Sequence, residues 1–319
     1  MNKKDKLEVT IFEKTAKKKR FSASEFSEKR KVISLKTLLV GDLHLKSRII
    51  LPMVEEKINE LDCQRVILLG DYVDAHGQNA NVELYNAELD NLLNWKSKMV
   101  SKGIEVITLI GNHDAPYLID EPKSFSIFNK KCFIETGEKL YALGLQVAYK
   151  LDDYIVSHAG FAWGQDLQEW HFNLLSSSDM GLIRALDKHV GISRGGKYWV
   201  GSPIWADYRF ELKENPNPHI LKQIVGHTRQ SKISLDSSLI GIDTYSILAK
   251  KEYPYFEFYG NGDLLLHDNE RFSTERNNLL SRYTDLLLHG GNDQLSVVKT
   301  NWGTPEIMEK IRANFHVEI

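Results

Sequence analysis

The strongest constraint on the fold of this 319-residue chain is an alternation of short apolar runs with helical segments. The β-type runs occupy residues 37–40, 65–69 and 104–110, and each is bounded by turn-forming residues. Residues 49–61 and 82–102 have the apolar spacing of amphipathic helices, and Gly103 is placed to end the second one. This order favours parallel strands with helices packed on the sheet, so the sequence predicts an α/β fold.

Further apolar runs at 154–157, 223–225 and 239–242 predict more strands, and residues 253–267 read as a hairpin. Residues 1–34 contain the basic stretches KTAKKKR and EKRK and lack sustained periodicity. We expect them to form a basic N-terminal arm, either simply solvated or in contact with nucleic acid or an acidic partner. The predicted organisation is an arm at 1–34, one catalytic domain at 35–290 and a C-terminal helical extension at 291–319.

Composition excludes several classes of protein. The net charge of −2 gives no reason to expect a surface that binds polyanions as a whole. Two cysteines are too few for a disulfide framework or a four-cysteine zinc site. No apolar run approaches the roughly 18 residues of a membrane span, and the first residues lack the apolar core of a secretory signal. We therefore expect a cytoplasmic enzyme without a membrane partner.

Five of the predicted strands finish in short polar clusters. These clusters read GDLH at 41–44, GDYVD at 70–74, GNHD at 111–114, SHAG at 157–160 and GHT at 226–228. Ligands of open α/β sheets bind where parallel strands present their carboxyl ends at one edge. Each cluster alone is typical of a turn or a structural histidine, but five in order after five apolar runs indicate a shared site.

The side chains in these clusters are metal ligands by type. They comprise two carboxylates, one carboxamide and three imidazoles, from Asp42, Asp71, Asn112, His44, His158 and His227. A mixed oxygen and nitrogen set suits transition metals better than Ca²⁺, and we expect Mn²⁺ first, with Fe, Zn²⁺ or Ni²⁺ as alternatives. Six ligands exceed one tetrahedral site, whereas two divalent ions about 3.5–4 Å apart would use them all.

In this order, the motifs resemble the signature of the calcineurin-like metallophosphoesterase superfamily, which runs Asp-x-His, Gly-Asp-x-x-Asp, Gly-Asn-His-Asp/Glu and then separate histidines. The resemblance implies a four-layer αββα sandwich with mixed sheets and a dinuclear metal site at the carboxyl edge of the strands. It implies that Asp42, His44 and Asp71 bind one metal. It also implies that Asp71 bridges to a second metal, whose remaining ligands are Asn112, His158 and His227.

The resemblance also implies roles for two residues that do not bind metal. His113 would be the general acid that protonates the leaving oxygen, and Asp74 would orient it and stabilise its charged form. A metal-bridging hydroxide would attack phosphorus while the metals stabilise the developing charge.

Within the superfamily, the chain is most similar to the phosphoprotein-phosphatase branch, which includes phage and bacterial Ser/Thr phosphatases and symmetric dinucleoside-tetraphosphate hydrolases. His227 is followed by Thr228-Arg229 rather than by a second histidine two residues later, and Ile242-Asp243-Thr244 resembles a strand of that branch. Three motifs depart from the pattern of that branch. Leu45 replaces a glycine after His44, and Ala75 replaces the arginine that holds substrate phosphate. Around Gly-Asn-His, Ile110 and Asp114 stand where the branch has arginine and glutamate.

Other cations are therefore expected to bind the substrate. We predict Arg194 and Arg209 for this role because guanidinium groups bind phosphate oxygens in pairs, and His76 as a partial replacement for the missing arginine. The aromatic residues of the same region, Trp199, Trp205 and Tyr208, are expected to be buried in the core. The alternative is that they line the pocket or stack on a base.

The predicted function is metal-dependent hydrolysis of phosphate monoesters, similar to that of protein phosphatases, on a phosphoprotein, a nucleotide or a small phosphoester. The first alternative is a phosphodiesterase, a dinucleoside-polyphosphate hydrolase or a nuclease, because the altered phosphate-binding positions bear on substrate choice. The second alternative is an inactive binding scaffold, which would have no need of the His113–Asp74 pair.

Overall fold

The computed structural model describes residues 35–75, 77–245, 247–249, 256–258, 260 and 262–276. The chain divides into two units, Met1–Ile33 and Ser34–Ile319, and the described residues all belong to the second. The predicted arm at 1–34, the predicted extension at 291–319 and His76 lie outside the described residues, so these predictions stay untested.

The first sheet has six strands in the order β12-β11-β1-β2-β3-β4. Its parallel centre is β1 (Thr37–Val40), β2 (Arg65–Leu68), β3 (Glu105–Leu109) and β4 (Leu145–Gln146). The strands β11 (Leu264–Asp268) and β12 (Arg271–Glu275) add an antiparallel edge beside β1. The three predicted strands of this sheet are confirmed to within one residue at either end.

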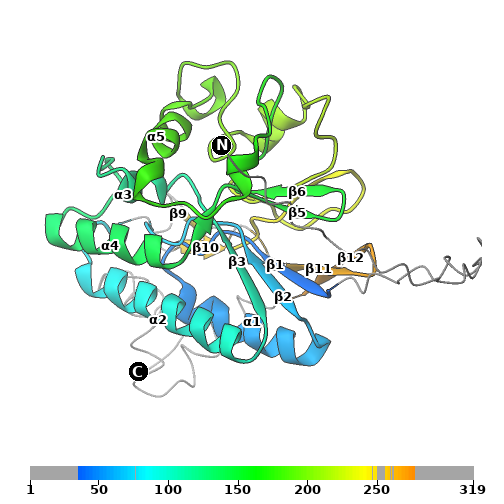
Figure 1. The fold of residues 1–319 in the computed structure, drawn as a ribbon, viewed down its shortest axis with the longest axis horizontal. Helices are drawn as coiled ribbons and strands as arrows, with labels where there is room; N and C mark the ends of the chain where they lie inside the picture. Colours follow the sequence, from blue (N-terminus) through cyan, green and yellow to red (C-terminus); the bar gives the residue numbers. More distant parts are fainter. Residues whose placement is uncertain are drawn as a thin grey trace, which may run out of the picture. The chain divides into compact units, whose positions relative to one another are not determined.

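Three helices cover one face of this sheet: α1 (Ser47–Leu61), α2 (Val82–Ser101) and α4 (Lys130–Ala142) (Figure 1). The side chain of Asn81 caps the start of α2 by accepting a hydrogen bond from the Leu84 amide. Gly103 follows the end of α2 with φ of +81°, a conformation that suits a residue without a β-carbon. The predicted helices are therefore confirmed, whereas α4 was not predicted.

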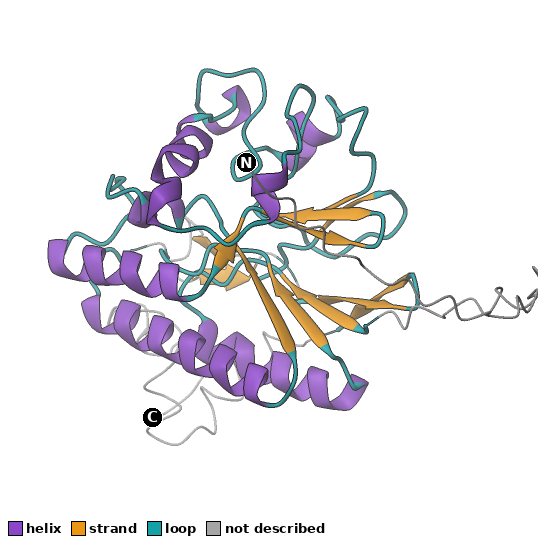
Figure 2. Ribbon diagram, viewed as in Figure 1, coloured by secondary structure: helices purple, strands orange, loops and turns teal. Residues whose placement is uncertain are grey.

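The second sheet has four strands in the order β5-β6-β7-β8. The strand β6 (Tyr154–Ser157) pairs antiparallel with β5 (Ala148–Leu151) and parallel with β7 (Gln223–Val225), which pairs parallel with β8 (Leu239–Gly241). The segment between β6 and β7 contains short helices joined by loops: η1 (Glu169–Phe172), η2 (Ser177–Asp179), α5 (Met180–Lys188), η3 (Ile192–Arg194) and η4 (Tyr208–Leu212) (Figure 2).

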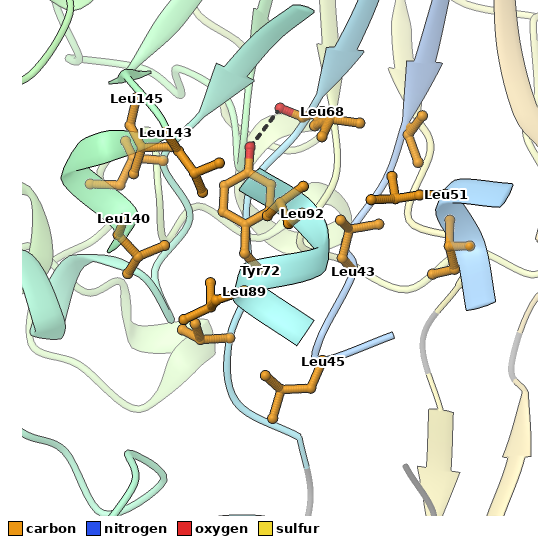
Figure 3. Close-up of a cluster of buried hydrophobic side chains, with 14 of the residues drawn as sticks. Leu43, Leu45, Leu51, Leu68, Tyr72, Leu89, Leu92, Leu140, Leu143 and Leu145 are labelled. Atoms are coloured by element: carbon orange, nitrogen blue, oxygen red, sulfur yellow. Dashed lines mark hydrogen bonds between the residues drawn. The ribbon is translucent and has the colours of Figure 1, made fainter. Parts of the chain in front are cut away.

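Alternation of side chains along the strands builds two separate cores. In β1, Leu38 and Val40 pack with the helices, whereas Leu39 packs with Ile224 and Ile240 of the second sheet. Figure 3 shows the helix-side core, where α2 contributes Leu89 and Leu92 and α4 contributes Leu140. Its other labelled side chains are Leu43, Leu45, Leu51, Leu68, Tyr72, Leu143 and Leu145. The prediction of an α/β fold with two mixed, helix-flanked sheets is thus confirmed.

One predicted supersecondary element is wrong. The expected hairpin at 253–267 is split, because β10 (Phe256–Phe258) pairs with β9 (Ile247–Ala249) whereas β11 pairs with β1 and β12. The apolar residues of β11 complete the edge of the first sheet, and this tertiary pairing outweighs the local turn signal at 260–263. Among the described residues, no helix is long and apolar enough to cross a membrane.

Candidate metal centre

The ends of five parallel-paired strands bring the candidate ligands together. Asp42, Asp71 and Asn112 follow β1, β2 and β3 of the first sheet, and His158 and His227 follow β6 and β7 of the second. The loops after β1 and β2 are joined directly, because the His44 amide donates to the Asp71 carbonyl oxygen at 2.7 Å. The site therefore lies where the carboxyl ends of both sheets meet.

Four polar residues of the site have left-handed backbone conformations. His44, Asp71, Asp74 and His227 have φ values of 42°, 52°, 59° and 58°. Residues other than glycine seldom adopt such angles, and each costs on the order of 1 kcal/mol or more unless its surroundings compensate. Backbone strain of this kind concentrates at functional sites, where it directs side chains that relaxed strand ends would not bring together.

Two glycines permit this close approach of strand ends. A β-carbon on Gly111 would lie 2.1 Å from Asp71 Oδ1, and one on Gly226 would lie 2.3 Å from Asp42 Oδ1. Both distances are far inside van der Waals contact, so any larger residue would displace a candidate ligand.

The carboxylate of Asp71 is the centre of the arrangement. Its Oδ2 lies 3.5 Å from His44 Nε2 and 3.4 Å from His158 Nε2. Among the described residues, two groups of side chains are close enough to hold a metal ion, His44–Asp71–His113 and Asp71–His158–His227, and Asp71 belongs to both. Asp42 is not a member of the first group but lies beside it, with its Oδ2 4.0 Å from His44 Nε2.

Backbone carbonyl groups orient two of the imidazoles. His44 Nδ1 lies 2.8 Å from the Asp74 carbonyl oxygen and His158 Nδ1 lies 2.7 Å from that of Leu69, so each Nδ1 donates and each Nε2 points into the site. His158 Nε2 also lies 3.0 Å from Asn112 Oδ1 and 3.2 Å from His227 Nδ1. These three atoms converge with Asp71 Oδ2, and a set of oxygen and nitrogen atoms arranged in this way suits a metal ion.

The electrostatics of the site favour bound positive charge. Burial opposes ionisation of Asp71, but the imidazoles of His158, His113 and His44 hold its pKa well below the usual range. Burial also opposes protonation of His158, yet Asp71 and Asp42 raise the pKa of His158 to about 10. Without a cation, a proton on His158 thus offsets the negative charge of Asp71. A divalent ion would take over this role and release the proton.

The remaining imidazoles are poised to stay neutral, as metal ligands must be. Burial lowers the pKa of His44 to about 3 despite the nearby Asp71 carboxylate. Burial, with added repulsion from Arg194 and His158, holds the pKa of His227 well below its usual value. Neutral imidazoles, buried carboxylates and a carboxamide together fit divalent metal ions.

The Nδ1 atom of His113 is paired with a carboxylate, whereas those of His44 and His158 are paired with backbone carbonyl groups. His113 Nδ1 lies 3.0 Å from Asp74 Oδ2, while Oδ1 of the same carboxylate accepts hydrogen bonds from the hydroxyls of Tyr85, at 2.5 Å, and Tyr117. Burial opposes protonation of the imidazole, but Asp71, Asp74 and Asp114 raise the pKa of His113 above its ordinary value. The arrangement can therefore hold His113 as an imidazolium that donates a proton.

The three predicted substrate-binding residues have different surroundings. Arg194 lies beside the site, where its guanidinium contacts Thr228 Oγ1 at 2.6 Å and Asp207 Oδ2 at 2.9 Å, and its buried Nε has no hydrogen-bond partner. Arg209 is exposed and donates to the carbonyl oxygen of Arg229 at 2.7 Å. His76 is not among the described residues.

Sequence reasoning missed several residues of the site. The buried Lys46 donates to the His44 carbonyl oxygen at 3.2 Å, and burial lowers its pKa to about 8. Asp114 accepts the amides of Asp71, Tyr72 and Gly111, which joins the ends of β2 and β3. A lysine near a strand end looks in sequence like any surface lysine, but Asp114 follows Asn112-His113 directly and its position was a usable signal.

The aromatic side chains of the segment 199–208 differ in their burial. Tyr208 is buried, and Trp205 packs edge-on against His227 with ring centroids 5.9 Å apart. Trp199 is 65% exposed, so the expectation that it is a core residue is wrong. Its indole Nε1 is hydrogen-bonded to Asn215 on the surface instead.

A two-sheet α/β fold with histidine and carboxylate ligands at its strand ends defines a class of metal-dependent hydrolases. Residues 35–230 match the family model of calcineurin-like phosphoesterases. The match covers more than half of the chain, so the protein belongs to this family. The family implies hydrolysis of phosphoesters with divalent metal ions, and the candidate histidine and aspartate groups are present.

Two solved structures similar to this chain are phosphatases. A cold-active protein-tyrosine phosphatase from a psychrophilic Shewanella is 18% identical, with a TM-score of 0.48 and coverage of 76% of this chain and 80% of the other. A protein serine/threonine phosphatase from Saccharomyces cerevisiae is 12% identical, with a TM-score of 0.43 and coverage of 77% and 80%. Among curated proteins, no match was found.

Proposed function

We propose that the chain is a two-metal phosphomonoesterase in which His113 donates the proton to the leaving oxygen. The observation that carries this proposal is the pairing of His113 Nδ1 with Asp74 Oδ2 at 3.0 Å, directly beside the Asp71-centred ligands. An acid held by a buried carboxylate has a use in ester cleavage and none in a binding scaffold. The proposed ligands are Asp42, His44 and Asp71 for one ion, and Asp71, Asn112, His158 and His227 for the other.

The proposed division of labour follows from this geometry. When bound, two divalent ions supply an activated water and positive charge for the phosphoryl group. Asp74 keeps the His113 ring oriented and favours its protonated form. The His113 amide donates to Asp71 Oδ1 at 2.9 Å, which links the proposed acid directly to the proposed shared ligand. The charge of Arg194 acts on His227, and this guanidinium is proposed to hold phosphate oxygens.

The activity is tested with p-nitrophenyl phosphate and Mn²⁺, compared with bis-p-nitrophenyl phosphate. Turnover of the monoester that is lost on chelation and restored by Mn²⁺ supports the proposal. Faster turnover of the diester would favour a phosphodiesterase, and no turnover with any divalent metal would overturn both.

The role of His113 needs a separate measurement, because its ring also lies close enough to His44 and Asp71 to hold a metal ion. His113→Ala is expected to lower kcat by roughly 10²–10⁴ while metal content stays near that of the wild type. Loss of bound metal in this variant would make His113 a ligand and contradict its assignment as the acid.

A further inference from the structure

Three aromatic side chains of the loops that precede β7 are exposed to a degree that is unusual for large rings. Trp163, Trp199 and Phe210 have 60%, 65% and 65% of their surface accessible. Exposed aromatic residues that gather on one surface mark binding sites more often than chance exposure does. We call these three residues the aromatic platform.

Asn215 joins the three members of the platform. The Trp163 amide donates to the Asn215 carbonyl oxygen at 2.8 Å, and Trp199 Nε1 donates to Asn215 Oδ1 at 3.1 Å. Asn215 Nδ2 in turn donates to the Phe210 carbonyl oxygen at 3.5 Å. The platform therefore combines three separate segments of the chain, which Asn215 links through the Trp199 ring and through the backbones of Trp163 and Phe210.

The platform adjoins the strand end that carries His227. Tyr208, two residues before Phe210, donates its amide to Thr228 Oγ1 at 3.0 Å. The Arg209 guanidinium donates to the Arg229 carbonyl oxygen. Thr228 and Arg229 directly follow His227, so the segment that carries Phe210 contacts the loop that carries a candidate metal ligand.

The segments that carry Trp199 and Phe210 expose three cationic side chains. The segments 190–200 and 208–215, all of whose residues are described, expose Lys197, Arg209 and Lys213 against a single exposed acid, Glu214. Near Trp163, Asp166 adds one further exposed carboxylate. Aromatic rings interleaved with cations suit a polyanion that also carries flat rings, because bases stack on the aromatic residues while phosphates pair with the cations.

We propose that the aromatic platform binds single-stranded nucleic acid, with bases stacked on Trp199 and Phe210 and phosphates facing Lys197, Arg209 and Lys213. The proposed binding of nucleic acid depends only on the residues of the platform. Only the further statement, that the bound strand presents its phosphoester to the metal centre, rests on the proposed phosphoesterase function.

The test measures binding of two octamers to the full-length, Mn²⁺-loaded protein. One is oligo(dT) without terminal phosphates, and the other has the same backbone charge but abasic sugars. Stacking predicts that oligo(dT) quenches tryptophan fluorescence and binds more tightly than the abasic strand. Trp199→Ala and Phe210→Ala should each weaken oligo(dT) binding by about 5- to 150-fold, the usual worth of one stacked base. Trp199→Phe, which keeps a ring, should retain most of the affinity.

The matched control is Phe128→Ala, because Phe128 is 69% exposed and does not belong to the platform. This variant should bind oligo(dT) like the wild type. Equal binding of both octamers, with no effect of Trp199→Ala, would overturn the proposal. Binding would then be due to attraction between the phosphates of the strand and basic residues outside the platform, such as those of residues 14–20. The proposal would also be overturned by a phosphopeptide that displaces oligo(dT) and has a higher affinity than oligo(dT).

Turnover of p-nitrophenyl phosphate is measured on the same preparations. Stacking on Trp199 without turnover would refute the proposed function and leave the platform intact. Turnover without base-dependent binding would refute the platform alone.

Discussion

The ring of Phe125 packs against the imidazole of His113, with centroids 4.3 Å apart and the planes inclined by 47°. Phe125 lies between α3 (Ala115–Leu118) and α4, in a stretch that is fixed on both sides. The Ile127 amide donates to the Tyr117 hydroxyl at 2.9 Å, and Lys123 forms an ion pair with the buried Asp187 at 2.7 Å. Phe125 is thus a positioning residue for the proposed acid.

Removal of this contact should impair proton donation selectively. We expect Phe125→Ala to lower kcat by roughly 10-fold for an alkyl phosphate, whose leaving group must be protonated, because a general acid contributes most to such substrates. Turnover of 2,4-dinitrophenyl phosphate, whose leaving group departs without a proton, should change little. The measurement is kcat for a series of monoesters of graded leaving-group pKa.

Phe125→Tyr keeps the ring and serves as the matched control, with activity expected close to that of the wild type. A defect in Phe125→Ala that is equal across the whole substrate series would indicate general loosening of the site. His113→Ala must show the same leaving-group dependence in larger measure if the two residues act together.

The two tyrosines that clamp Asp74 should contribute unequally to stability. Tyr117 donates to Asp74 and accepts from the Ile127 amide. The Tyr85 hydroxyl donates to Asp74, and its only other hydrogen-bond partner within the described part of the chain is the Tyr117 hydroxyl. Tyr117→Phe leaves a buried amide without its partner and should cost about 1–3 kcal/mol, and Tyr85→Phe should cost less. Urea denaturation of both variants measures the difference, and a larger loss in Tyr85→Phe would contradict this account.

Much of the fold was predictable because local patterns and tertiary structure agree. The runs that form β1, β2 and β3 are apolar on both faces, since Leu38 packs against helices and Leu39 against the second sheet. Such runs are visible in sequence as short, bounded segments. The pairing of β11 with β1 was not predictable, because strand partners far apart in the chain leave no local signal.

Some residues of the candidate site could likewise be predicted from the sequence, and others could not. Motif spacing identified the polar residues at the strand ends, such as Asp71 and His158. The spacing carried no information about Phe125 or Lys46, whose roles depend on which loops meet in space. Exposure of Trp199 was likewise beyond sequence reasoning, because a tryptophan within a glycine-rich loop is compatible with either environment.

Asp71 should control the binding of both metal ions, because it belongs to both candidate ligand groups. Asp71→Asn is expected to lower bound Mn²⁺ from two ions to fewer than one and to remove most of the stabilisation that Mn²⁺ gives the wild type. A ligand present at 100 times its Kd stabilises a fold by about 2.7 kcal/mol, so the shift in melting temperature is measurable. Elemental analysis provides the stoichiometry. Asp153→Asn, at an exposed ion pair with Lys222, is the control, and retention of both ions in Asp71→Asn would exclude a shared ligand.

A partly buried lysine distant from the ligands should make stability depend on pH. Lys96 donates to Thr108 Oγ1 at 3.0 Å and to the Leu143 carbonyl oxygen at 2.6 Å, and burial lowers its pKa from 10.5 to about 8. Between these two pH values the unfolded chain binds more protons than the folded chain. Folding stability should therefore increase with pH across this window, by at most about 1.4 kcal/mol per unit.

The contribution of Lys96 is isolated by subtraction. Lys96→Met removes the titrating group and keeps the long side chain, so the difference in unfolding free energy between wild type and variant should change with pH only above pH 8. A difference that stays constant from pH 7 to pH 10 would show that the folded-state pKa of Lys96 is not lowered.

Arg194 should affect the binding of substrate more than the binding of metal. Its guanidinium is aligned by Asp207 and Thr228, beside His227, and loss of one charged hydrogen-bond donor to a phosphate costs about 1.5–3 kcal/mol. Arg194→Ala is therefore expected to raise KM for p-nitrophenyl phosphate by roughly 10- to 150-fold. Arg194→Lys should give an intermediate value, because it keeps the charge but loses the planar fork.

The metal content of these variants distinguishes a substrate ligand from a structural residue. The charge of Arg194 lowers the pKa of His227 and repels cations from that side of the site, so Arg194→Ala should bind Mn²⁺ at least as tightly as the wild type. Arg271→Ala, on the exposed strand β12, controls for loss of surface charge and should leave KM unchanged. An unchanged KM in Arg194→Ala, or a loss of bound Mn²⁺, would show that Arg194 only supports the loop that carries it.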